Sequence, residues 1–107
     1  MLFRSANAIA DIDAAIAEAA SVVPIKTAKT LVAVAGTATT VAAAALNLAE
    51  YDRYSIHLSR IPANRVHEIA EQFFTMSRDE RAALGYMHEG RVDVIAAGAL
   101  EIGRAHV

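Results

Sequence analysis

The chain has 107 residues, of which 55% are hydrophobic and only 6% aromatic, and it contains neither Trp nor Cys. This length supports one small domain or part of a larger one. The formal net charge of -2 gives no basic field to hold nucleic acid, so no nucleic-acid partner is expected. The absence of Cys excludes disulfides and thiolate metal sites, and it fits a reducing cytoplasm.

The first predicted element is a helix from Asn7, which can cap it, to about Val22. Pro24 ends this helix because the residue before a proline avoids helical backbone. An apolar stripe at helical spacing supports the prediction: Ile9, Ile12, Ile16 and Val23.

A strand, a glycine turn and a helix follow. Residues 31–35, LVAVA, form a valine-rich apolar run that predicts a fully buried strand. Gly36 breaks the run, and residues 37–48 predict an alanine-rich helix. Because one parallel-type strand cannot form a sheet alone, we expect it to borrow strands from a missing portion or a partner.

The uncharged stretch between Lys29 and Glu50 is long enough to be compared with a membrane span. Several threonines and Gly36 interrupt it, and alanine is only weakly lipophilic. We therefore expect no membrane partner, and the N-terminus shows no signal peptide.

The second half of the chain predicts a short edge strand and three helices. Residues 55–58 alternate in polarity, as an edge strand does, and Ser59 can cap the next helix, with Pro62 in its first turn. That helix carries a clear amphipathic stripe: Val66, Ile69, Ala70, Phe73 and Phe74.

Two further helices complete the predicted elements. Residues 77–80 form an S-x-x-E capping box, which opens a short helix closed by Gly85. Gly90 and Arg91 open a final helix, from residue 92 to 100 or beyond.

The glycine turn is the best candidate binding site. A helix N-terminus presents unpaired N–H groups and a partial positive charge, and Gly36 lets backbone approach an anion closely. Thr37, Thr39 and Thr40 add hydroxyl donors, so we predict phosphate binding by these four residues. The alternative is a plain strand-to-helix turn with a threonine cap. The turn is not a Walker A loop, because no lysine follows the glycine.

Other residues give weaker signals. Gly98 lies in an apolar helix among alanines, where close packing against another helix explains it. The sequence His67-Glu68-x-x-Glu71 lacks the second histidine of H-E-x-x-H, so a solvated helix face is expected and no metal ligand is assigned. No Ser–His–Asp set can be assembled, and no catalytic residue is assigned.

The two ends fit the interior poorly. The codons GTG CTC TTC CGA TCT would encode residues 1–5 with GTG as start, and GAG ATC GGA AGA GCA CAC GTC would encode residues 101–107. These are the ends of common short-read sequencing adapters. We therefore interpret 1–5 and 101–107 as probable non-native scars around a native segment, 6–100.

Four blocks in order resemble the exopolyphosphatase/guanosine-pentaphosphate phosphatase (Ppx/GppA) family, in its actinobacterial form. They are TLVAVAGTATTVA at 30–42, YD at 51–52, IHLSR at 56–60 and GRVDVIAAGAL at 90–100. The order and spacing of the blocks are more specific than any single block.

The resemblance implies an α/β fold: a fragment of the second lobe of an actin-like ATPase (ribonuclease H-like) domain, mostly helical with one or two short strands. Ala35-Gly36-Thr37 matches a phosphate-side loop that usually reads Gly-Gly-Thr/Ser, so Ala35 replaces its first glycine. Gly98 matches a small contact residue on the helix packed between the lobes.

The family's activity is hydrolysis of a terminal phosphoanhydride, in polyphosphate or guanosine pentaphosphate, with Mg²⁺. Its catalytic glutamate lies before this piece begins, so the resemblance implies an inactive fragment of an enzyme that is often a homodimer. Two alternatives remain: a non-catalytic phosphate- or nucleotide-sensing relative, and a small helical interaction module without a ligand.

Overall fold

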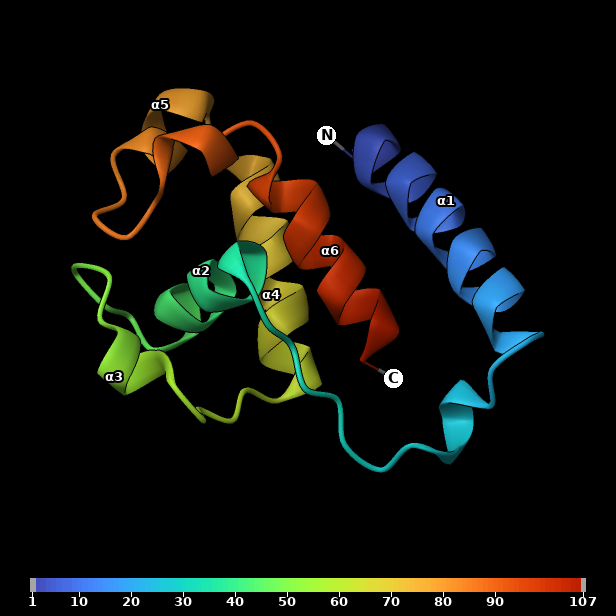
Figure 1. Cartoon of the computed structure of the whole chain (residues 1–107). Coiled ribbons are helices and arrows are strands. Elements are labelled where there is room, and N and C mark those ends of the chain that lie inside the picture. The colour runs from blue at the N-terminus through green and yellow to red at the C-terminus, as the bar shows by residue number, and fades with distance from the viewer. Residues whose placement is uncertain (1, 107) are drawn as a thin grey trace.

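The structure, a computed structural model, describes residues 2–106 and is helical (Figure 1). In chain order the elements are α1 (Leu2–Ala20), η1 (Ile25–Thr27), α2 (Gly36–Ala45), α3 (Arg53–Ile56), α4 (Ala63–Thr75), α5 (Arg78–Ala82), η2 (Glu89–Arg91) and α6 (Ile95–Ala105). None of these described helices is long and apolar enough to cross a membrane.

The core lies where α4 packs along α6. Helix α2 contacts both of them, and α1 packs on α6 (Figure 1). The predicted stripe of α4 is confirmed, since its first four members are buried and Phe74 is half-buried. The main cluster of buried side chains consists of Val41, Val66, Ile69, Ala70, Phe73, Ile95, Ala99 and Leu100.

Helix α1 begins earlier than the sequence predicts. It runs from Leu2, so Asn7 lies inside the helix and is not its cap. The stripe Ile9, Ile12 and Ile16 is half-buried, whereas Val23 lies beyond the helix and is 54% exposed. The helix continues upstream of Asn7 because nothing in residues 2–6 breaks it.

The prediction of one or two short strands is wrong for the described residues 2–106, which contain no strand. Residues 31–35 are exposed, with Val32 and Val34 at 76% and 78%. Backbone hydrogen bonds from residues 29–34 are absent among the described contacts. A strand needs a neighbour to form its ladder, and no described segment supplies one.

The predicted edge strand at 55–58 is also wrong. Asp52 caps a short helix there, α3, by accepting hydrogen bonds from the backbone N–H groups of Tyr54 and Ser55 at 3.0 and 3.4 Å. Capping satisfies the unpaired N–H groups at a helix start. It therefore favours a helix here, although the alternation in polarity is typical of a strand.

Helix α2 ends before the predicted residue 48. Asn47 adopts a left-handed conformation, with φ 54°, and its N–H donates to the Ala44 carbonyl at 3.1 Å. The N–H of Leu48 donates to the Ala43 carbonyl at 3.0 Å. This pair of bonds is the Schellman motif, in which asparagine can replace glycine.

The later helices follow the sequence more closely. The capping box between Ser77 and Glu80 is confirmed at the start of α5, although that helix ends at Ala82, before Gly85. Pro62, and not Ser59, is the N-cap of α4. Helix α6 begins at Ile95 because η2 occupies the turn before it.

Ala35 is the strained residue at the start of α2. Its φ of 77° and ψ of -175° lie in a region that essentially only glycine adopts. An L-alanine there costs about 1–3 kcal/mol, because its Cβ approaches the backbone too closely. The strain falls at the position where the resembled loop has its first glycine.

We predict that Ala35→Gly stabilises the chain by about 1 kcal/mol, the relief of strain exceeding the added freedom of the unfolded chain. Thermal unfolding followed by circular dichroism should show a midpoint about 5 °C higher. The control is Ala44→Gly in α2, which should destabilise by about 1 kcal/mol. A lower midpoint for Ala35→Gly would contradict the assigned backbone conformation.

Candidate functional site

The N-terminus of α2 presents free backbone donors. Ala35, its N-cap residue, makes no side-chain cap. The N–H groups of Gly36, Thr37 and Ala38 have no acceptor within residues 2–106, whereas the N–H of Thr39 donates to the Ala35 carbonyl at 3.1 Å. Three aligned donors at the positive end of a helix form a local anion-attracting surface.

Two of the predicted threonines hold the turn together. The Oγ1 atoms of Thr39 and Thr40 donate to the Gly36 carbonyl oxygen, at 3.0 and 2.7 Å. Thr40 is only 2% exposed. In this conformation both hydroxyl protons are engaged within the helix, so Thr39 and Thr40 fix the Gly36 peptide.

Arg91 meets this turn from η2. A Cβ added at Gly36 would overlap the Arg91 guanidinium, so that cation lies directly against the glycine. The sequence interpretation gave Arg91 only a role at a helix start and missed this contact. Its presence in the GRVDVIAAGAL block was the one signal that could have indicated it.

Gly98 reaches the same turn from α6. A Cβ added at Gly98 would lie 2.7 Å from Cγ2 and 3.2 Å from Oγ1 of Thr37. Thr37 therefore packs on the face of α6 that Gly98 leaves open. The two features that the sequence singled out separately, the glycine turn and Gly98, are in contact.

A hollow of about 440 Å³ opens beside this contact. Its walls are residues 31 and 33–38, Arg91 and Gly98, with Glu101, Ile102 and Ala105 from the end of α6. The last three belong to the segment that we interpret as non-native. Within the segment 6–100, the contacts at this hollow described above come from Gly36, Thr37, Arg91 and Gly98.

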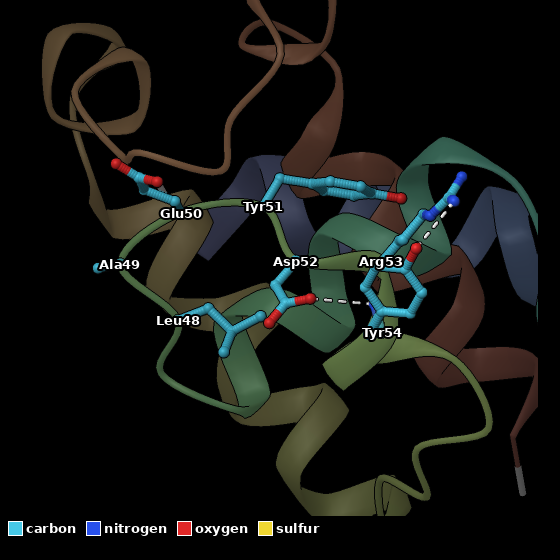
Figure 2. A pocket seen from close by; sticks show the side chains of 7 residues that line it. All are labelled: Leu48, Ala49, Glu50, Tyr51, Asp52, Arg53 and Tyr54. Atoms are coloured by element: carbon cyan, nitrogen blue, oxygen red, sulfur yellow. Dashed lines mark hydrogen bonds between the residues drawn. The ribbon is translucent and has the colours of Figure 1, made fainter.

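A second hollow, of about 650 Å³, is lined by residues 48–54 (Figure 2). Two of its polar side chains have local partners: Arg53 donates to the Tyr54 hydroxyl at 3.2 Å, and Asp52 accepts from the hydroxyl of the neighbouring Ser55 at 2.8 Å. The hydrogen bonds from Ser55, and then from the N–H of Tyr54, hold the pKa of Asp52 below its usual value. Asp52 of the YD block thus has a structural role, the capping of α3.

Residues 2–106 bring together no group of three or more His, Asp or Glu side chains that could hold a metal ion. These residues therefore hold no ligand set made of protein side chains alone, although Mg²⁺ is commonly held through one or two carboxylates and substrate phosphates. Several carboxylates already have partners: Asp52 and Glu80 act as caps, and Asp93 pairs with Arg78 at 2.9 Å.

Comparisons with known proteins agree on the family to which this chain is similar. The model of the Ppx/GppA phosphatase family matches residues 2–104. Exopolyphosphatase 2 of Mycobacterium tuberculosis is 45% identical over 80 residues, in strains CDC 1551 and H37Rv alike. That match covers 75% of this chain but 25% of the relative, so the chain spans about a quarter of the curated proteins it resembles.

The fold also matches a solved structure. The crystal structure of an exopolyphosphatase-like protein superposes with a TM-score of 0.92 at 34% identity, over 97% of this chain and 32% of the other. The family model, the sequence relative and the solved structure agree, and the chain therefore belongs to the Ppx/GppA phosphatase family.

Proposed function

We propose that this chain forms one wall of the phosphate site of a longer exopolyphosphatase, which hydrolyses the terminal phosphoanhydride of inorganic polyphosphate. The contact of the Arg91 guanidinium with Gly36, at the N-terminus of α2, carries the proposal. The names of the curated relative and of the structural neighbour support polyphosphate as the substrate class.

The charge at this contact is the physical argument. A cation beside the positive end of a helix is unfavourable by several tenths of a kcal/mol to about 1 kcal/mol, unless an anion lies there as well. Guanidinium and free N–H groups both donate to phosphate oxygens. A phosphate in the hollow would thus join two groups that otherwise repel.

The four predicted residues then divide between two roles. Gly36 offers its N–H and the space for Arg91, and Thr37 offers its N–H and its hydroxyl. Thr39 and Thr40 act through the Gly36 carbonyl, which they hold by hydrogen bonds. Gly98 lets α6 lie against Thr37 and so closes one side of the site.

The rest of the proposed enzyme lies outside this chain. By family resemblance it has an actin-like ATPase fold and carries a catalytic glutamate that no residue here matches. Members of the family are often homodimers, and we expect a cytoplasmic protein. By the same resemblance Mg²⁺ takes part in the reaction of the intact enzyme. The exposed residues 31–34 would pair with strands of that missing portion.

We predict that the protein encoded at the complete locus releases phosphate from polyphosphate in the presence of Mg²⁺, whereas the 107-residue chain alone releases none. Phosphate release should be measured for both proteins, with guanosine pentaphosphate assayed in parallel to identify the preferred substrate. A rate for the isolated chain like that of the intact enzyme would refute the prediction.

The same locus tests the interpretation of the two ends. We expect a genome to continue the native protein before residue 6 and after residue 100, with codons unrelated to the adapters. A genomic copy that encodes MLFRS and EIGRAHV at these positions would overturn the interpretation.

Arg91→Gln should weaken the binding of inorganic tripolyphosphate to this chain about tenfold, because a charge-assisted contact is lost. Titration of the backbone amide signals of Gly36 and Thr37 by NMR measures the affinity and locates the site. The matched control is Arg78→Gln, which removes an equal charge from an exposed ion pair with Asp93 and should leave the affinity within twofold. Equal losses in both variants would indicate unspecific attraction.

A further inference from the structure

Arg81, on α5, links two parts of the molecule through its guanidinium. Its Nη1 donates to the carbonyl oxygens of Phe73 and Met76, at 3.0 and 2.8 Å, and its Nε donates to the Val92 carbonyl at 2.9 Å. The side chain is half-buried. The exposed Arg78, one turn earlier, makes a single bond to Asp93.

The first two carbonyls belong to the C-terminal end of α4. The last carbonyls of a helix have no partner within it, and a cation there also meets the negative end of the helix dipole. Helix α4 belongs to the core, with Ile69 and Phe73 at 0% and 2% exposure. Arg81 is therefore bound to the end of a helix that packs in the core.

The third carbonyl belongs to the residue directly after Arg91. Arg91 ends the short turn η2, in which its N–H donates to the His88 carbonyl at 2.9 Å. Val92 is 1% exposed, so Arg81 and the core hold it from two sides. The position of the Arg91 backbone is thereby tied to α4.

We propose that Arg81 is a positioning residue of the phosphate site. Its hydrogen bonds hold η2 in the position at which the Arg91 guanidinium lies against Gly36. This inference rests on the proposed function, since it concerns the same anion. Arg81 donates its own hydrogen bonds to three carbonyls and acts on the anion through Arg91. The planar guanidinium, and not its charge alone, allows Arg81 to donate hydrogen bonds to α4 and to Val92 at the same time.

The test is a double-mutant cycle for tripolyphosphate binding by the 107-residue chain, read from the Gly36 and Thr37 amides. Arg81→Gln should weaken binding about fivefold in the otherwise unchanged chain, and less than twofold in the R91Q background. R81K should weaken binding as much as R81Q, because one ammonium cannot reproduce the planar guanidinium. R78Q is again the control, and circular dichroism selects a temperature at which every variant is folded.

The outcomes separate the two proposals. No binding to the unchanged chain, or no loss in R91Q, would refute the phosphate site and this inference with it. Three other outcomes would overturn the role of Arg81 and leave the phosphate site supported. Binding could weaken in R91Q but not in R81Q, R81Q could have an equal effect in both backgrounds, or R81K could bind as tightly as the unchanged chain. If R81Q does not fold, R81K with R91Q completes the same cycle.

Discussion

The close approach of two segments to the N-terminus of α2 is the constraint on which the candidate site depends. At Gly36 the missing Cβ admits the Arg91 guanidinium, and at Gly98 it admits the Thr37 side chain. Ile95 and Ala99, which flank this contact along α6, are fully buried in the core. The geometry of the site is thus set by helix packing, which tolerates little displacement.

The elements that the sequence predicted well are those that local information determines. The stripe of α4 has helical spacing, and its buried residues follow directly from that spacing. The capping box at Ser77 satisfies its own N–H groups within one turn, so no distant partner is needed. The location of the glycine turn was likewise visible, because Gly36 separates two apolar runs of different composition.

The wrong predictions concern features that depend on distant groups or on competing caps. Residues 31–35 have the composition of a buried strand, but burial needs a neighbouring strand, which residues 2–106 lack. At 55–58 the alternation in polarity was outweighed by the Asp52 cap. The contact of Arg91 with Gly36 joins residues far apart in sequence, and no local pattern of either residue predicts it.

The hollow beside Gly36 adjoins the segment that the sequence predicts as a strand. The chain supplies positive charge to the hollow through Arg91 and the start of α2. The exposed residues 31–34 lack a neighbouring strand, and Leu31, Ala33 and Val34 also line the hollow beside Gly36. A strand that paired with this segment would bring the remainder of the protein to the edge of the proposed phosphate site. Completing the sheet and completing the active site would then be one structural event.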